Sequence, residues 1–130
     1  MNDSARILCI DDNGRNLRIL QELLEDDFQL SCATSGEDGL SSIADFHPEL
    51  ILLDVMMPGL DGYEVCRRVK ADPSTADIPV VLLSALARDD DRERGSRAGA
   101  DAYLAKPFDP DALLDLVENY IGATRAVRNV

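Results

Sequence analysis

The sequence predicts a single α/β domain in which helices cover both faces of a five-stranded parallel sheet. Short apolar runs alternate with segments whose apolar residues recur at helical spacing, which makes five strand–helix pairs. Residues 50–53 are apolar without interruption, as expected of a strand that is buried on both faces. No linker or low-complexity segment separates the pairs. Because crossovers between parallel strands are right-handed, the pairs predict a doubly wound sheet.

Start and stop signals place the individual elements. Strands are predicted at residues 6–10, 28–33, 50–53, 80–83 and 102–105, and the first helix at about 13–25. Ser35 begins the second helix, and Asp61 caps the third with Glu64 as its reciprocal partner. Asp109 caps the last helix, which has Pro110 at its first position.

The predicted helices differ in how many apolar residues they offer to the core. In the second helix, Leu40, Ile43 and Ala44 form the expected buried side. The fourth helix, residues 88–98, has little more than Ala98 as an apolar anchor. We therefore expect the fourth helix to be the least stable one.

The domain is expected to span residues 1–122. Residues 123–130 show no clear packing period and are predicted to be a tail or the start of a linker helix.

Composition excludes several classes of protein. Hydrophobic residues make up 45% of the 130 residues, which is enough for a packed core. The net charge of -12 would repel a phosphate backbone, so direct binding of nucleic acid is not expected. No apolar run has the roughly 20 residues of a membrane helix, and the N-terminus does not resemble a signal peptide. We expect a cytoplasmic protein that does not bind a membrane.

Three cysteines are present: Cys9, Cys32 and Cys66. They have no CxxC spacing and cannot all pair with one another. They are therefore predicted to be reduced thiols of an intracellular core.

Reactive side chains follow four of the predicted strands. Asp11 and Asp12 follow the first, Asp54 the third, Ser84 the fourth and Lys106 the fifth. In such sheets the ligand site lies outside the carboxyl ends of the strands, where the winding direction switches. With the strand order 2-1-3-4-5, the first and third strands are neighbours, so three carboxylates would converge.

Converging carboxylates repel one another and favour a compensating cation. Mg²⁺ suits this site, because it takes one or two carboxylates together with water and phosphate oxygens. A carboxylate is also a known nucleophile for phosphoryl transfer, and we assign this role to Asp54. Lys106 and Ser84 would then bind phosphoryl oxygens. Alternatively, Asp54 is a turn residue, Asp11 and Asp12 cap the first helix, and Lys106 is solvated.

Four motifs in order resemble the receiver domain of two-component response regulators, the CheY-like family. They are DD at 11–12, LDVMMPGLDG at 53–62, SA at 84–85 and GADAYLAKPF at 99–108. The resemblance extends over residues 6–121, and it implies a flavodoxin-like fold. It also implies that a sensor histidine kinase or a histidine phosphotransfer protein phosphorylates Asp54. Mg²⁺ would be held by Asp12, Asp54 and the main-chain carbonyl of Met56, with Asp11 acting through water.

The same resemblance assigns the response. Ser84 and Lys106 would bind the phosphoryl group, Tyr103 would be the aromatic switch residue, and the Lys106–Pro107 bond would be cis. Phosphorylation would change the surface of the fourth helix, fifth strand and fifth helix, which a downstream protein target or output domain would recognise. A phosphorylation-dependent homodimer is compatible with this arrangement. Such a domain catalyses only its own phosphorylation and dephosphorylation and is not a conventional enzyme.

Two alternatives belong to other functional classes. A small aspartyl-phosphate phosphatase or phosphotransferase would use Asp54 or Asp11 on a metabolite, although no extra segment is available to cover a substrate. A pseudo-receiver would serve only as an interaction module, but the acidic pair, Ser84 and Lys106 argue against this. Stoichiometric labelling of Asp54 by a small acyl phosphate would distinguish these alternatives from a phosphoacceptor.

Overall fold

The computed structural model describes residues 4–85, 89–107 and 109–128, with residues 89 and 124–128 described by their backbone alone. The strands are β1 (Arg6–Ile10), β2 (Gln29–Ala33), β3 (Leu50–Asp54), β4 (Val80–Ser84) and β5 (Ala102–Ala105). The helices are α1 (Gly14–Leu24), α2 (Gly36–Phe46), α3 (Gly62–Ala71), α4 (Asp89–Arg97) and α5 (Pro110–Arg128). The predicted alternation of strands and helices is confirmed.

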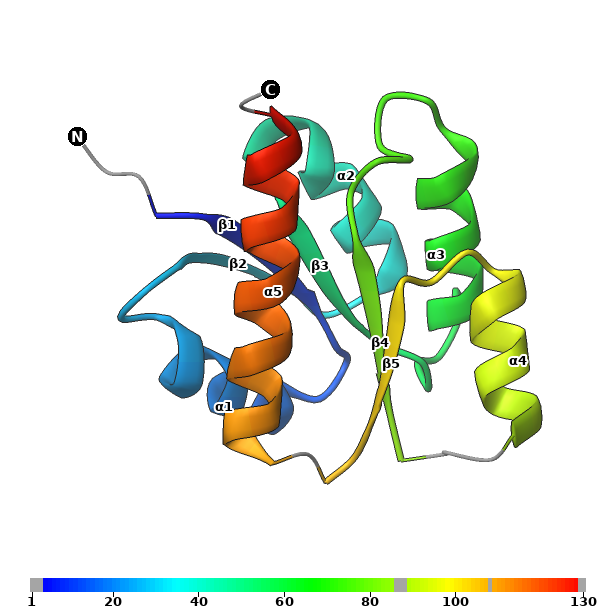
Figure 1. The fold of residues 1–130 in the computed structure, drawn as a ribbon. Helices are drawn as coiled ribbons and strands as arrows, with labels where there is room; N and C mark the ends of the chain where they lie inside the picture. The colour runs from blue at the N-terminus through cyan, green and yellow to red at the C-terminus, as the bar shows by residue number, and fades with distance from the viewer. Residues whose placement is uncertain (1–3, 86–88, 108, 129–130) are drawn as a thin grey trace.

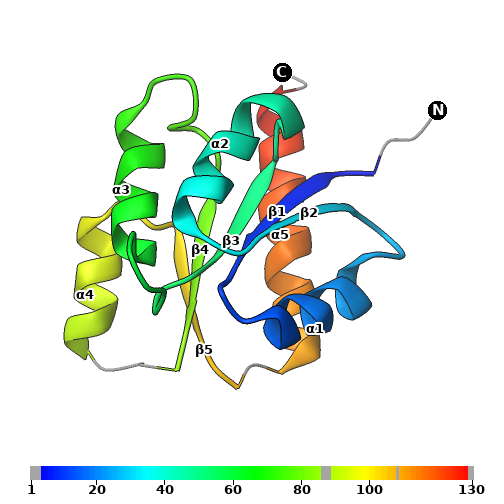
Figure 2. The ribbon, with the colours of Figure 1, turned by 180° about the vertical axis from the view of Figure 1, so that it is seen from behind.

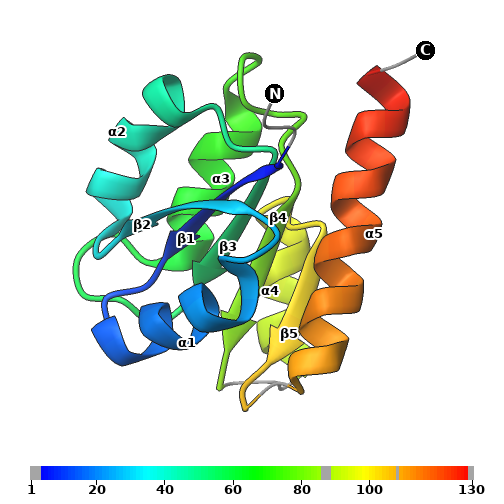
Figure 3. The same ribbon diagram turned by 90° about the vertical axis from the view of Figure 1, so that its left-hand side faces the viewer.

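All strand pairs in the sheet are parallel, and the strand order is β2-β1-β3-β4-β5. This order confirms the predicted doubly wound topology. Helices α1 and α5 cover one face of the sheet, and α2, α3 and α4 cover the other (Figures 1, 2 and 3). Because the strands are parallel, the carboxyl ends of β1, β3, β4 and β5 meet at one edge of the sheet, the lower edge in Figure 1.

Successive residues of a strand pack alternately in two separate hydrophobic cores, one on each face of the sheet. Ile51 and Leu53 of β3 pack in the core under α2, α3 and α4, whereas Leu50 and Leu52 pack in the core under α1 and α5. Both β3 and β4 are buried at every position. Since fully burying one such side chain contributes about 1.5–3 kcal/mol, these two strands form a firm base for the residues at their carboxyl ends.

Helix caps follow the predicted chemistry with two corrections. Ser35 caps α2 and Asp61 caps α3, where the Asp61 carboxylate accepts a hydrogen bond of 2.9 Å from the Glu64 N–H. The Glu64 side chain does not complete a reciprocal cap but pairs with arginines of its own helix. Helix α1 is capped by Asn13, whose side chain accepts from two backbone N–H groups. This leaves Asp12 for another role.

Two further details depart from the predictions. Ala44 is exposed, whereas Gly36, Gly39 and Ile43 are the buried residues of α2, and Gly39 lies close to the sheet. A Cβ atom on Gly39 would overlap the side chain of Ile10, so only a glycine allows this approach. Strand β2 begins at Gln29, one residue later than predicted.

Helix α5 continues to Arg128, so the backbone has no break at residue 122, where we place the end of the domain. That boundary remains a prediction. Among the described residues, no helix has both the length and the apolar character needed to cross a membrane.

Candidate functional site

Three carboxylates converge at the carboxyl edge of the sheet, as the strand order predicts. Asp11 follows β1, Asp12 is next to it, and Asp54 is the last residue of the neighbouring β3. One carboxylate oxygen from each lies within 4.8 Å of the others. Asp11 and Asp54 are only 2% and 6% exposed, whereas Asp12 is exposed. The cluster therefore has a buried floor and one side open to solvent.

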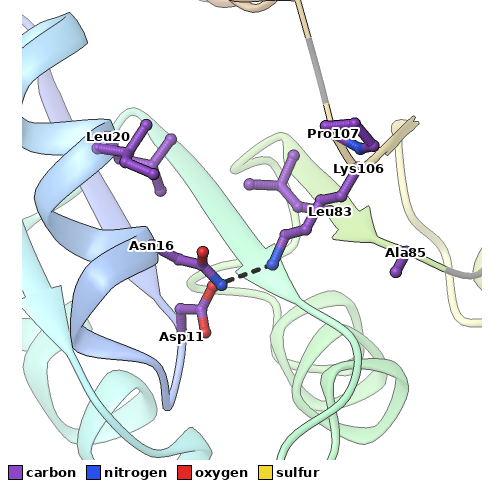
Figure 4. Close-up of a pocket in the computed structure, with 8 residues that line it drawn as sticks. Asp11, Asn16, Leu20, Leu83, Ala85, Lys106 and Pro107 are labelled. Atoms are coloured by element: carbon purple, nitrogen blue, oxygen red, sulfur yellow. Dashed lines mark hydrogen bonds and ion pairs between the residues drawn. The ribbon is translucent and has the colours of Figure 1, made fainter.

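Lys106 brings a positive charge into this cluster. Its Nζ atom lies 2.9 Å from Asp54 Oδ1 and 3.2 Å from Asp11 Oδ2, and Figure 4 shows the pairing with Asp11. The backbone N–H of Lys106 donates a hydrogen bond of 2.7 Å to the Ser84 carbonyl, which ties the end of β5 to the end of β4. The Lys106–Pro107 bond is cis, as expected.

The charges at the site do not balance. Burial raises the pKa of Asp54; the hydrogen bond from Lys106 opposes this rise, and the charge of Asp11 adds to it. Burial alone would lower the pKa of Lys106, but the hydrogen bond and attraction to Asp54, together with Asp11, raise it. Both shifts favour the protonated forms: burial is the main cause for Asp54, and the neighbouring carboxylates of Asp54 and Asp11 are the cause for Lys106. The cluster therefore has the charge and the oxygen ligands to attract a cation.

The position of Asp54 is set by the tight turn after β3. The Val55 N–H donates to the Leu83 carbonyl over 3.2 Å, and the Gly62 N–H donates to the Val55 carbonyl over 3.0 Å. A Cβ atom on Gly62 would overlap the Asp54 carbonyl oxygen and lie 2.7 Å from Val55 Cα. Only glycine fits this position, so Gly62 lets α3 begin directly beside the end of β3.

Asp11 is also held by backbone groups. Its carboxylate accepts a hydrogen bond of 2.9 Å from the Asn13 N–H. Its own N–H donates to the Ala33 carbonyl over 3.1 Å, which ties the ends of β1 and β2 together.

The remaining predicted site residues are Ser84, Tyr103 and Met56. Ser84 is fully buried at the end of β4, between β3 and β5. Tyr103 in β5 is half-buried, and the guanidinium of Arg92 lies 5.6 Å from the centre of its ring. Met56 follows β3 by two residues, and its side chain is 60% exposed.

A hollow of about 330 Å³ adjoins the cluster on the α1 side (Figure 4). Leu20, Leu83 and Pro107 are among its apolar lining residues, and Asp11 and Lys106 are the charged ones.

The sequence did not single out Tyr63, which joins α3 to α4. Its hydroxyl donates to the Asp91 carbonyl over 3.2 Å, and the Arg94 guanidinium lies 4.4 Å from the centre of its ring. Burial, followed by the proximity of Tyr103, raises the pKa of Tyr63 to about 12. Tyr63 lies three residues before Cys66, which could have placed it on the inner face, but its contacts with α4 are not visible in a local pattern.

Comparisons with known proteins agree with this architecture. The family model of the response regulator receiver domain matches residues 7–118. Response regulator PleD of Caulobacter vibrioides is 48% identical over 107 residues, which are 82% of this chain and 24% of PleD. The chain thus spans about a quarter of the length of that relative.

Solved structures show the same fold. The activated receiver domain of DrrB, a Thermotoga maritima protein, is 34% identical with a TM-score of 0.84, covering 92% of this chain and 98% of that one. The receiver domain of the Pseudomonas aeruginosa sensor histidine kinase PA1611 is 30% identical, with a TM-score of 0.84 and the same coverage.

The sheet topology and the acidic edge beside Lys106, together with the matching family model, identify a signalling domain of the CheY-like class. The chain belongs to the family of response regulator receiver domains, which act in two-component systems together with histidine kinases and output domains.

Proposed function

We propose that this receiver is a phosphoacceptor and that Asp54 takes a phosphoryl group from a sensor histidine kinase or a histidine phosphotransfer protein. The observation that carries the proposal is the environment of the Asp54 carboxylate. It ends a strand that is buried along its whole length, lies in an acidic cluster and accepts a 2.9 Å hydrogen bond from Lys106. A nucleophile held in a fixed position and an adjacent cation both favour an in-line displacement at phosphorus.

In the proposed reaction, an Asp54 oxygen forms a bond to phosphorus while the bond from phosphorus to the donor's imidazole nitrogen breaks. The imidazole leaves with that electron pair and takes up a proton, and Asp54 becomes an aspartyl phosphate. The Lys106 ammonium, already beside Asp54, would then bind a phosphoryl oxygen. The Ser84 hydroxyl would donate to another oxygen.

The donor set suits Mg²⁺, which prefers oxygen ligands. We propose that Asp12, Asp54 and the main-chain carbonyl of Met56 hold the ion, with Asp11 acting through water. When bound, Mg²⁺ would neutralise negative charge on the carboxylates and on the phosphoryl group. The related PA1611 receiver, whose active-site cleft coordinates a magnesium ion, supports this choice.

Labelling with acetyl phosphate in the presence of Mg²⁺ tests the proposal. We expect one phosphoryl group per chain, mapped by mass spectrometry to Asp54, and no label in Asp54→Asn. Asp61→Asn is the matched control: its carboxylate lies in the same loop but caps α3, and asparagine also caps well.

Each alternative function predicts a different outcome of this labelling. Many turnovers of acetyl phosphate per chain would indicate a phosphatase. No label on the folded protein would indicate a pseudo-receiver, and persistent label on Asp54→Asn would move the site elsewhere.

We further propose that phosphorylation changes the α4–β5–α5 surface through Ser84 and Tyr103. An output domain, a downstream target or a second copy of the chain would recognise the changed surface. Amide exchange with and without beryllofluoride, a phosphoryl mimic, tests this step. We expect changed protection across residues 89–105, and unchanged protection there would contradict it.

The domain boundary belongs to the same proposal. Residues 1–122 would form the receiver, and residues 123–130 would be a C-terminal tail or the start of a linker.

A further inference from the structure

Two of the three cysteines face each other across β1 and β2. Cys9 and Cys32 are register partners on these adjacent parallel strands, and both pack in the core under α1. Each thiol shifts the pKa of the other, upward for Cys9 and downward for Cys32. Neighbouring strands lie about 4.8 Å apart, and disulfides join Cα atoms separated by about 4.4–6.8 Å. The backbone therefore already holds the two residues at a separation that a disulfide allows.

The two thiols differ in environment. Cys9 is completely buried, whereas Cys32 lies on the edge strand and is partly exposed. The Gln21 side-chain amide donates to Cys32 Sγ over 3.4 Å. The hydrogen bond from Cys9 and the one from Gln21 together lower the pKa of Cys32 to about 7, against the effect of burial. Since the thiolate is the reactive form, Cys32 is suited to attack and Cys9 to resolve.

We propose that Cys32 is a peroxide-reactive modification site and that Cys9 is its resolving thiol. The Cys32 thiolate attacks one oxygen of hydrogen peroxide, the O–O bond breaks, and the products are Cys32 sulfenic acid and hydroxide. Cys9 sulfur then attacks Cys32 sulfur, the S–O bond breaks, and the hydroxyl leaves with the Cys9 proton as water. The two thiols are oxidised to one disulfide, and the peroxide is reduced to water.

Cys66 provides an internal control. It lies on α3, packs in the opposite core, and its Sγ contacts the Ala98 carbonyl at 3.5 Å. Burial raises the pKa of the Cys66 thiol to about 11. Cys66 should therefore react much more slowly than Cys32.

Peptide mapping after exposure of the reduced protein to hydrogen peroxide tests the proposal. Remaining thiols are alkylated, and the chain is cut after glutamates, because Glu25 and Glu49 separate the three cysteines. We expect Cys9 and Cys32 peptides that are joined with loss of two hydrogens and released by dithiothreitol. Cys66 should be recovered alkylated, with oxidation at least about tenfold slower than at Cys32.

Variants separate the two chemical steps. In Cys9→Ala, Cys32 should stop at the sulfenic acid, which dimedone traps; in Cys32→Ser, neither the sulfenic acid nor the disulfide should form. Urea-unfolded protein is the control that shows how the cysteines are oxidised when β1 and β2 are not paired. The proposal is overturned if folded wild-type protein forms no Cys9–Cys32 disulfide under conditions that oxidise the unfolded chain. Equal oxidation of Cys66 and Cys32 would also overturn it.

Discussion

Strands β3 and β4 differ from helix α4 in how much apolar side chain they bury. Both strands are buried at every position, and they present Asp54 and Ser84 at their last residues. In α4, the buried positions are Asp91 and Gly95, followed by Ala98 just beyond the helix. The chemistry therefore rests on close-packed strands, whereas α4 has little apolar side chain to bury.

The contacts that hold α4 are correspondingly weak. Arg94 and Arg92 lie over the rings of Tyr63 and Tyr103, at 4.4 and 5.6 Å from the ring centres. A cation–π contact contributes about 0.5–1 kcal/mol at an exposed site, compared with about 1.5–3 kcal/mol for one fully buried leucine. A domain that must hold a reactive group still while changing its surface gains from this division, because shifting α4 disrupts little of the core.

The largest effect is expected at the rigid site. Gly62→Ala should lower the free energy of unfolding by about 3 kcal/mol or more, because the new Cβ would overlap backbone atoms that cannot move aside. Gly122→Ala is the control: it lies in α5 with nothing within 4 Å of the added Cβ. There we expect a gain of about 0.5–1 kcal/mol from helix propensity. Urea unfolding followed by circular dichroism measures both, and similar values for the two variants would contradict the comparison.

Removing the positive charge of Lys106 should have the next largest effect on stability. Without Mg²⁺, Lys106→Met should destabilise the fold by about 2 kcal/mol, because Asp54 and Asp11 lose their shared partner. Adding Asp54→Asn to Lys106→Met should recover most of the loss, since the variant then lacks one uncompensated carboxylate. Mg²⁺ should stabilise Lys106→Met more than the double variant. A double variant no more stable than Lys106→Met would show that charge is not the cause.

Removing the hydroxyl of Tyr63, which contacts α4, should lower the free energy of unfolding by about 1 kcal/mol. Tyr63→Phe removes its hydrogen bond to the Asp91 carbonyl, and a hydrogen bond typically contributes about 0.5–1.5 kcal/mol.

Tyr63 also predicts a pH dependence. Its pKa is raised from 10.0 to about 12 in the folded protein, so folding favours the neutral phenol. The resulting stability is present below pH 10 and is lost as the pH rises towards 12. By about pH 11, wild-type protein should lose about 1 kcal/mol that Tyr63→Phe does not lose. Parallel unfolding curves against pH for the two proteins would contradict a buried, un-ionised Tyr63.

The smallest effect is expected at Gly95. A Cβ atom there would lie 3.0 Å from Leu82 Cδ1 and 3.3 Å from Tyr103 Cδ2, which are side-chain atoms that can turn aside. Gly95→Ala should change stability by less than about 1 kcal/mol, because helix propensity offsets the crowding. Amide exchange in α4 should change, whereas labelling of Asp54 should not. A loss as large as that of Gly62→Ala would show that α4 is packed as tightly as the site.

Local patterns were sufficient to predict the strand–helix alternation and the place of each reactive residue. Asp54 ends an unbroken apolar strand, and Lys106 directly follows the last strand. Hydrophobic period is a local property, and parallel topology brings strand ends to one edge, so the acidic cluster follows from the sequence.

Only the tertiary structure decided the remaining features, because they depend on how distant segments pack. Tyr63 reaches Asp91 across 28 residues, and neither residue carries a local signal for that contact. The exposure of Ala44 and the close approach of Gly39 to Ile10 both depend on how α2 packs on the sheet, which composition cannot show. Cys9 and Cys32 lack any paired spacing and meet through strand register alone. Register is set by the sum of many side-chain contacts across the sheet, and for that reason it appears only in the folded chain.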